Sequence, residues 1–280
     1  NYGKGYDFQI ALFLLMLAPY YFFYVCKFVS AYHDRNRAVA ASQLLMPVIS
    51  ENHETSFSHE NVQLRSINIV NLSFSYPGSL VKVLHNIHLS LPAQGLVLIK
   101  GISGSGKSTL LKILTGSLVP CEGNLEVNGN SNEWSHRWLQ ANTSYMNQFP
   151  FIFDGSFRYN VFLENEHAVL PAYPSFLNKI LDKKEDGWQT MLSHNGKQLS
   201  GGERQLLTMA RMMLHPRPIA IMDEPTANLD AATVEIILEQ IVQMAGERLV
   251  IVASHEDKFD ALATTVLNLN WGEQMNVTNQ

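Results

Sequence analysis

The residues best suited to chemistry form a glycine-rich run, "GISGSGKST", from Gly101 to Thr109. The apolar segment "GLVLIKG" at 95–101 leads into it and predicts a buried strand, and the helical pattern "LLKILTG" follows. The glycines would let the backbone curl until its N–H groups face a phosphate, and the positive end of the helix would point at the same place. The pattern G-x-x-x-x-G-K-S, set between a strand and a helix, predicts a phosphate-binding loop.

The side chains of this loop have separate expected tasks. Lys107 is expected to reach the β- and γ-phosphates of a nucleoside triphosphate, and the Ser108 hydroxyl is expected to ligate Mg²⁺. The other residues are expected to surround the phosphates: Gly101, Ser103, Gly104, Ser105, Gly106 and Thr109. A nucleotide and Mg²⁺ are therefore the predicted ligands of this part of the chain.

A second run, "IAIMDEP" from Ile219 to Pro225, predicts an apolar strand that ends in two acids. Asp223 is expected to hold Mg²⁺, directly or through water. Glu224 stands where a carboxylate could polarise the attacking water as a general base. Two acids at a strand end can also form a solvated turn, but the phosphate-binding loop upstream favours the metal and the base.

The run "LSGGERQ", from Leu199 to Gln205, resembles the signature motif of the ABC (ATP-binding cassette) ATPases. Its two glycines open the predicted helix "QLLTMARMML", whose N-terminus would be a second place for an anion. The resemblance implies that Ser200, Gly201 and Gly202 act in trans on ATP held by another cassette. It also implies that ATP closes a dimer of two cassettes.

Four further residues match the family's motifs in the family's order. Tyr76 in "FSYPG" is similar to the aromatic residue that stacks on adenine, and Gln148 in "YMNQFPFIF" to the glutamine that touches Mg²⁺ and the attacking water. Asp230 in "ANLD" resembles the D-loop, and His255 in "IVASHED" resembles the switch histidine that contacts the γ-phosphate. Taken singly, Tyr76 could be a strand-end aromatic, Gln148 a surface amide and His255 a satisfied polar group beside a strand. Their order along the chain favours membership of the family over these separate explanations, and the resemblance covers nearly all of residues 66–270.

The resemblance implies an α/β fold, namely a P-loop NTPase cassette with a mixed sheet core over 66–280 and a helical subdomain over about 149–215. ATP and Mg²⁺ are the implied ligands. No member of the implied catalytic set is missing, so we expect a cassette that hydrolyses ATP. That set is Lys107, Gln148, Glu224 and His255.

Two stretches near the signature bear on coupling to a membrane domain. The family usually has a glutamate where His194 stands, and this departure puts the usual coupling contact in doubt. The aromatic run "FPFIFDGSFRYNV" at 149–161 lies where exporters of the family dock coupling helices. The same aromatics could instead form the core of the helical subdomain.

Composition and charge narrow the class of protein. The 280 residues are 46% hydrophobic and 16% charged, and the net charge of −5 gives no basic field for nucleic acid. Cys26 and Cys121 have no metal-type spacing, which favours a reduced compartment. The chain starts at Asn1 rather than Met, so we expect it to be a piece of a longer subunit.

The stretch from Phe8 to Cys26 has no charged residue and is close to the length that crosses a bilayer as a helix. Lys27 and the arginines after it put the C-terminal side in the cytoplasm. The pattern continues to Met46, so we expect the last helix of a multi-pass membrane domain and its extension at 1–49, then a linker at 50–65. A buried core helix or a signal peptide is the alternative. The expected location is the cytoplasmic (inner) membrane, with the cassette in the cytoplasm.

The segment "LAPYYFF…AYHDRNRAVAAS", Leu17 to Ser42, is similar to the last membrane helix of the subunits that export cysteine and glutathione for cytochrome bd assembly. It departs from them at Tyr20 and Tyr24. The similarity implies a half-transporter in a heterodimer, with a thiol as the small-molecule substrate. A homodimeric exporter of lipid, peptide or drug is the alternative. A soluble ABC ATPase of DNA repair or translation would lack the front helix.

Overall fold

The computed structural model describes residues 13, 15–29, 31–32, 35, 62–79, 81–102, 104–131, 133–163 and 172–269, and the backbone of 276–279. The chain divides into two compact units, Asn1–Val62 and Gln63–Gln280. Each unit is described by itself.

In the first unit, residues 13, 15–29, 31–32 and 35 are helical, and their side chains are exposed. Among the described residues, no helix is both long and apolar enough to cross a membrane. The remainder of the helix predicted over 8–46, and the linker up to residue 61, lie outside the described residues. The membrane span therefore stays a prediction.

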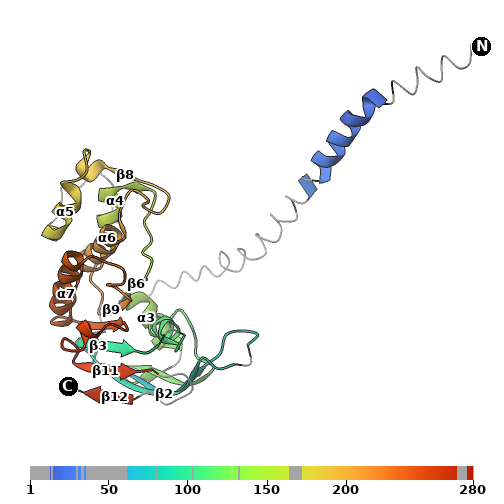
Figure 1. The fold of residues 1–280 in the computed structure, drawn as a ribbon. Coiled ribbons are helices and arrows are strands. Elements are labelled where there is room, and N and C mark those ends of the chain that lie inside the picture. Colours follow the sequence, from blue (N-terminus) through green and yellow to red (C-terminus); the bar gives the residue numbers. More distant parts are fainter. Residues whose placement is uncertain are drawn as a thin grey trace, which may run out of the picture. The chain divides into compact units, whose positions relative to one another are not determined.

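A six-stranded sheet forms the centre of the second unit, with the order β12-β11-β3-β10-β9-β6 (Figure 1). Its neighbouring strands are parallel except β11 and β12, so the sheet is mixed, as the family resemblance implies. Every residue of β9 and β10 is buried, as expected of parallel strands that are covered on both faces. The strands are β3 (Gly95–Lys100), β6 (Thr143–Met146), β9 (Ile219–Asp223), β10 (Leu249–Ala253), β11 (Thr265–Asn268) and β12 (Asn276–Asn279).

The other described strands form two smaller sheets. A four-stranded antiparallel sheet has the order β2-β1-β4-β5, and β7 pairs with β8 in a two-stranded sheet. In most of β2 buried and exposed residues alternate, which is typical of a strand with one face on a core. Their bounds are β1 (Ser66–Phe74), β2 (Leu84–Pro92), β4 (Glu122–Val127), β5 (Asn130–Ser131), β7 (Gly155–Ser156) and β8 (Met191–Leu192).

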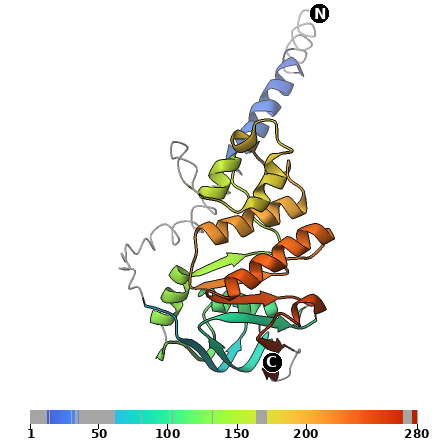
Figure 2. The ribbon, with the colours of Figure 1, turned by 90° about the vertical axis from the view of Figure 1, so that its left-hand side faces the viewer.

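Helices cover the central sheet. Alternate residues of its strands point into two different hydrophobic cores, one on each face of the sheet. Leu96 and Leu98 of β3 join one core with α6 and α7, which lie side by side (Figure 2). Val97 and Ile99 join a second core with α2 and the four-stranded sheet. The helices are α2 (Lys107–Leu114), α3 (Glu133–Asn142), α4 (Phe157–Phe162), α5 (Asn178–Leu181), α6 (Gly201–Leu214) and α7 (Ala231–Ala245), with 3₁₀ turns η1 (Ser175–Leu177), η2 (Gly187–Gln189) and η3 (Asp257–Phe259).

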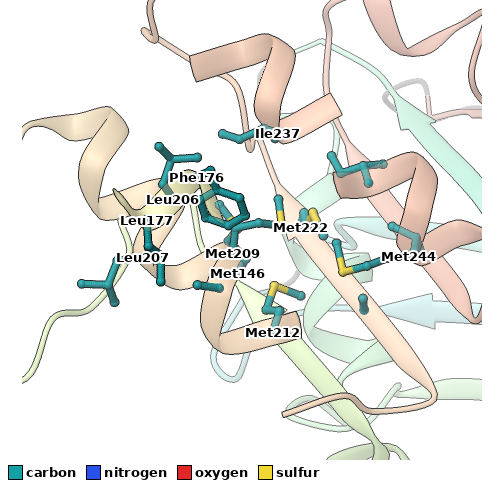
Figure 3. Close-up of a cluster of buried hydrophobic side chains, with 14 of the residues drawn as sticks. Met146, Phe176, Leu177, Leu206, Leu207, Met209, Met212, Met222, Ile237 and Met244 are labelled. Atoms are coloured by element: carbon teal, nitrogen blue, oxygen red, sulfur yellow. The ribbon is translucent and has the colours of Figure 1, made fainter. Parts of the chain in front are cut away.

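The first core joins α6 to the sheet through methionines (Figure 3). Met209 and Met212 come from α6, Met222 from β9 and Met244 from α7, and all are buried. Methionine is unbranched and flexible, so it fills irregular gaps between elements that meet at different angles. The signature helix α6 is therefore packed against the strand that ends in Asp223.

The parallel register places the candidate site at one edge of the sheet. Ala253, the last residue of β10, pairs with Ile99 on one side and with Asp223 on the other. Ligands of open α/β sheets bind outside the carboxyl ends of the strands. The loops that follow β3, β9 and β10 therefore emerge together.

Candidate functional site

The loop between β3 and α2 is held in a tight turn. Gly106, the N-cap of α2, has φ 97°, and a Cβ there would lie 2.8 Å from Leu84 Cδ2, so only glycine fits. Lys107 Nζ donates hydrogen bonds to the carbonyl oxygens of Gly101 (2.7 Å) and Ile102 (3.2 Å). The ammonium group is thus held against its own loop at the N-terminus of α2.

Ser108 and Asp223 meet beside this loop. Ser108 Oγ donates a 2.7 Å hydrogen bond to Asp223 Oδ2, and Asp223 is buried. The Tyr145 hydroxyl lies 3.5 Å from the same oxygen, and burial together with Asp223 raises the pKa of Tyr145 to about 12. A hydroxyl, a carboxylate and the nearby Gln148 amide are the oxygen ligands that Mg²⁺ prefers. These side chains therefore fit the predicted ion.

Glu224 is fixed by the end of β10. Its backbone has φ 48°, a left-handed conformation that is uncommon for a residue with a side chain, and its N–H donates to the Ala253 carbonyl (2.8 Å). Its carboxylate accepts from Ser254 Oγ at Oε2 (3.1 Å) and lies 3.0 Å from His255 Nδ1 at Oε1. Three consecutive residues thus hold the backbone and the carboxylate of Glu224.

A cavity of about 610 Å³ opens over these groups, a size that suits a nucleotide. Nine residues predicted from the sequence line it: Gly104, Gly106, Lys107, Ser108, Thr109, Gln148, Asp223, Glu224 and His255. Val83 and Ile102 also line it and were not predicted. Ile102 lies inside the glycine-rich run and could have been found there, whereas no motif marks Val83.

Among the described residues, three that were predicted for the nucleotide site do not line the cavity: Tyr76, Gly101 and Ser105. Ser105 is 2% exposed, and a Cβ on Gly101 would lie 2.5 Å from its hydroxyl, so this pair shapes the loop from inside. The Tyr76 hydroxyl lies 3.1 Å from Thr109 Oγ1, which brings the ring to the start of α2. Ser103 lies outside the described residues.

The signature residues cap a helix away from this cavity. Ser200 Oγ accepts from the Glu203 N–H (3.1 Å), and Glu203 Oε2 accepts from the Ser200 N–H (3.0 Å), which is a capping box. Gly201 and Gly202 form the first turn of α6. Asp230 caps α7, and hydrogen bonds from Thr233 lower its pKa. None of the residues 200–202 or Asp230 lines the cavity of its own chain.

The aromatic run after Gln148 divides into two parts. Phe149, Phe151 and Phe153, here called the aromatic surface, are 77%, 62% and 39% exposed. Phe157 and Val161, further along the run, are fully buried. The first part is therefore surface and the second part is core. The core interpretation holds for Phe157 and Val161, and docking on the aromatic surface stays a prediction.

His194 lies in the turn that precedes the signature. Its backbone is left-handed, with φ 51°, and its Nδ1 lies 3.1 Å from the Ser193 hydroxyl. The next residue, Asn195, accepts a 2.7 Å hydrogen bond from the Ile152 N–H. This bond ties the turn to the segment that carries the aromatic surface.

Comparison with known proteins places this chain in a family. Residues 84–227, about half of the chain, match the family model described as "ABC transporter". The glutathione/L-cysteine transport system ATP-binding/permease protein CydC of Bacillus subtilis is 33% identical over 255 residues, which is 88% of this chain and 44% of that protein. The pediocin PA-1 transport/processing ATP-binding protein PedD of Pediococcus acidilactici is 33% identical over 229 residues, 77% of this chain and 32% of that protein. The chain thus spans less than half the length of these relatives.

A solved structure agrees in fold. The structure of a bacterial Atm1-family ABC exporter with ATP bound superposes with a TM-score of 0.67 at 26% sequence identity. The match covers 75% of this chain and 38% of that one. The order of the motifs, the cavity at the carboxyl edge of the parallel strands and the family model agree with one another. This chain belongs to the ABC transporter family.

Proposed function

We propose that this chain binds ATP with Mg²⁺, hydrolyses it and uses the energy to move a substrate across a membrane. One observation carries the hydrolytic part of the proposal. A single cavity holds the P-loop ammonium of Lys107, the Ser108–Asp223 pair and the Glu224–His255 pair. These are the groups that phosphoryl transfer to water requires.

We expect ATP to bind in the cavity in one direction. Its phosphates would meet Lys107 and the N-terminus of α2, and its adenine would meet Tyr76 and Val83 near the mouth of the cavity. Mg²⁺, held by Ser108, Asp223 and Gln148, would neutralise charge on the phosphate oxygens. The Tyr76 ring, which is 39% exposed, would then offer its face to the base.

Hydrolysis is assigned to Glu224 and His255. The Glu224 carboxylate takes a proton from a water as the water oxygen bonds to the γ-phosphorus and the bond to the bridging oxygen breaks. ADP and phosphate leave. His255, which lies within hydrogen-bond distance of Glu224 in this structure, would contact the γ-phosphate. Lys107 would hold oxygens of the β- and γ-phosphates.

A second cassette would complete the site. The residues 200–202 and Asp230 do not line the cavity of their own chain, but they cap the N-termini of α6 and α7. This supports the proposal that they act on ATP bound to a partner half-transporter. A heterodimer is favoured by the similarity to CydC, and a homodimer is the alternative.

The transport part of the proposal rests on the resemblance and on the relatives. We assign 1–49 to the last helix of a membrane domain, 50–65 to a linker and 66–280 to the cassette, with a helical subdomain at about 149–215. The aromatic surface would receive the loops of the membrane domain, and His194 would replace the family's acid beside it. The chain would lie in the inner membrane, with the cassette in the cytoplasm.

For the substrate we favour a thiol such as cysteine or glutathione. The support is the Leu17–Ser42 segment together with the name of the CydC relative. The PedD relative, which is equally identical, supports a peptide exporter as the second candidate. A soluble ABC ATPase acting on nucleic acid or ribosomes is less favoured, because both relatives described above are transport proteins by name.

The proposal is tested with the complete transporter in inside-out vesicles. We expect uptake of radiolabelled cysteine or glutathione that requires ATP and Mg²⁺. Replacing Glu224 by Gln should lower ATP turnover by at least about a hundredfold, because a general base contributes that much. Turnover that does not change would exclude this role for Glu224. Active turnover without thiol uptake would instead favour the peptide exporter.

A further inference from the structure

Ser254 lies between the end of β10 and the switch residue His255, and it is fully buried. Its hydroxyl oxygen lies 3.1 Å from Glu224 Oε2 and 3.2 Å from the Glu256 backbone nitrogen. Its own N–H donates to the carbonyl of Ile99, the fifth residue of β3 (3.1 Å). The backbone of Ser254 is therefore held by the strand that leads into the phosphate-binding loop, and its hydroxyl faces Glu224 and Glu256.

The direction of these hydrogen bonds follows from the donors available. The Glu256 N–H can only donate, so the Ser254 oxygen accepts that bond. A serine hydroxyl has one hydrogen, which then points to the Glu224 carboxylate. Hydrogen bonds to an ionised carboxylate are stronger than those between neutral groups. Ser254 thus favours one orientation of the carboxylate.

His255 holds the other carboxylate oxygen in a different way. Its side chain is 69% exposed, whereas that of Glu224 is 12% exposed. An exposed ring can exchange its partner without disturbing the core, but the buried Ser254 hydroxyl cannot turn away from both of its partners. One oxygen of Glu224 therefore has a fixed partner, and the other has an exchangeable one.

We propose that Ser254 is a positioning residue for Glu224, which keeps the carboxylate aimed at the attacking water while His255 contacts the phosphate. This inference rests on the proposed role of Glu224 as the base. With Oε2 fixed by Ser254, release of His255 frees Oε1 to accept from water. Without the hydroxyl, the carboxylate would rotate, and fewer encounters with water would have the geometry for proton transfer.

A purely structural role for Ser254 would be to satisfy the partly buried Glu256 N–H. Ser135 provides a matched control for that role. It is also fully buried, its hydroxyl accepts from the Val127 N–H (3.3 Å) and donates to the Asn130 carbonyl, and it does not line the cavity. Ser254→Ala and Ser135→Ala therefore remove the same group from comparable surroundings.

The test is the kinetics of ATP hydrolysis by the complete transporter. Ser254→Ala should lower kcat by about tenfold to a hundredfold, because that is the effect of one hydrogen bond to a charged group. KM for ATP should not change, since Glu224 is not assigned to ATP binding. Ser135→Ala should leave both constants unchanged, and urea unfolding of both variants measures any loss of stability. Ser254→Thr, which keeps the hydroxyl, should recover most of the activity.

A double-mutant cycle distinguishes positioning from structure. If Ser254 acts through Glu224, Ser254→Ala should lower the residual turnover of Glu224→Gln no further. An additional drop as large as in the wild type would overturn the inference, and so would equal kcat for Ser254→Ala and Ser135→Ala. Both results leave the proposed hydrolysis intact. A wild-type transporter without ATP turnover would overturn the proposed function and this inference together.

Discussion

Ser108 Oγ, in the first turn of α2, donates a 2.7 Å hydrogen bond to Asp223 Oδ2, at the last residue of β9. The two groups are two of the three proposed Mg²⁺ ligands, and they already lie close enough to share one ion. Elements that are 115 residues apart in the chain are thus brought together by the parallel sheet and by the helix that follows the loop.

Replacing Asp223 by Asn should weaken the binding of Mg²⁺ more than the binding of ATP. The amide keeps the size of the side chain but removes the negative charge, so we expect the Mg²⁺ concentration for half-maximal turnover to rise at least about tenfold. Binding of ATP without Mg²⁺ should be unchanged or tighter, because a negative charge is removed from beside the phosphates. Turnover and ATP binding are measured over a Mg²⁺ titration.

The exposed Asp186 provides the control for this substitution. Asp186→Asn makes the same change of charge outside the cavity and should leave the titration unchanged. An unchanged Mg²⁺ dependence in Asp223→Asn would show that another group holds the ion.

Asn160 holds the segment that carries the aromatic surface, and its replacement by Ala should destabilise the cassette. Its fully buried amide accepts from the Phe153 N–H (2.9 Å) and donates to the carbonyl oxygens of Phe153 (2.9 Å) and Ser156 (3.1 Å). Arg211 of α6 also donates to it (2.5 Å). Alanine would remove the hydrogen bonds that the amide makes to these buried and partly buried groups, at a cost of about 2–4 kcal/mol.

Urea unfolding measures this cost. Asn178, which is exposed and bonds only to the Tyr173 hydroxyl (3.2 Å) among the described side chains, is the matched control. Asn178→Ala should change the free energy of unfolding by about 0.5 kcal/mol or less. Equal unfolding midpoints for the two variants would contradict the structural role of Asn160.

The positions of the motifs could be predicted from the sequence because the parallel sheet is specified locally. The apolar runs at 95–101 and 219–225 predict strands, and β3 and β9 end at Lys100 and Asp223. Once the strands are parallel, their carboxyl ends must share an edge. The loop and the acids therefore meet without any further information.

The polar partners around the site could not be predicted in this way. Ser254 and Lys100 sit at the ends of apolar runs, where periodicity shows a buried strand but not the neighbour that a polar end will meet. Lys100 pairs with Asp257, 157 residues away, and no local pattern encodes that distance. The left-handed backbone of Glu224 is likewise set by the end of β10 rather than by its own neighbours.

The ion pair of Lys100 with Asp257 and Asp260 makes stability depend on pH. Lys100 Nζ lies 2.9 Å from Asp257 Oδ1 and 2.8 Å from Asp260 Oδ2. Hydrogen bonds to Asp260 and Asp257 raise the pKa of Lys100, and the hydrogen bond from Lys100 lowers the pKa of Asp257. The contribution of Asp257 is present above its ordinary pKa of about 3.9 and is lost as the pH falls through the lower folded value. That of Lys100 is present below about 10.4 and is lost as the pH rises through the higher folded value.

Lys100→Met should therefore lower the free energy of unfolding between about pH 5 and pH 10, and its difference from the wild type should shrink outside that window. Urea unfolding over a pH series measures this difference. Lys82→Met, which removes the partner of Glu122 (2.6 Å), controls for loss of a lysine elsewhere. A difference for Lys100→Met that is constant below pH 4 would contradict the pairing with Asp257 as its cause.

Gly201 offers the sharpest test of the signature. Its replacement by Ala should affect a contact with ATP of another cassette without affecting the stability of its own cassette. Apart from its chain neighbours and the backbone of its own helix, no described atom lies within 4 Å of the place that a Cβ would occupy. The residue is in the first turn of α6, where alanine is accepted. The free energy of unfolding should be unchanged or higher. Turnover should fall on the order of a hundredfold if this open face approaches ATP of another cassette, because a methyl group would displace the phosphate.

Substitutions at two other glycines serve as controls for this result. Gly246→Ala, at the C-cap of α7 with φ −66°, should leave turnover unchanged because it lies outside the cavity and the signature. Gly202→Ala would bring a methyl group 3.2 Å from Thr233 Cγ2, so a loss of stability is expected there and not at Gly201. Full turnover in Gly201→Ala would show that this face meets no nucleotide.

Mixing variants then identifies the partner. In a homodimer of Gly201→Ala with Glu224→Gln chains, one of the two sites combines an intact Glu224 with the intact signature of the other chain, so turnover should return in the mixture. Neither variant alone supplies such a site. In a heterodimer with a different half-transporter, mixing the two variants would restore nothing, whereas adding the wild-type partner to each variant would show whose signature completes whose cavity.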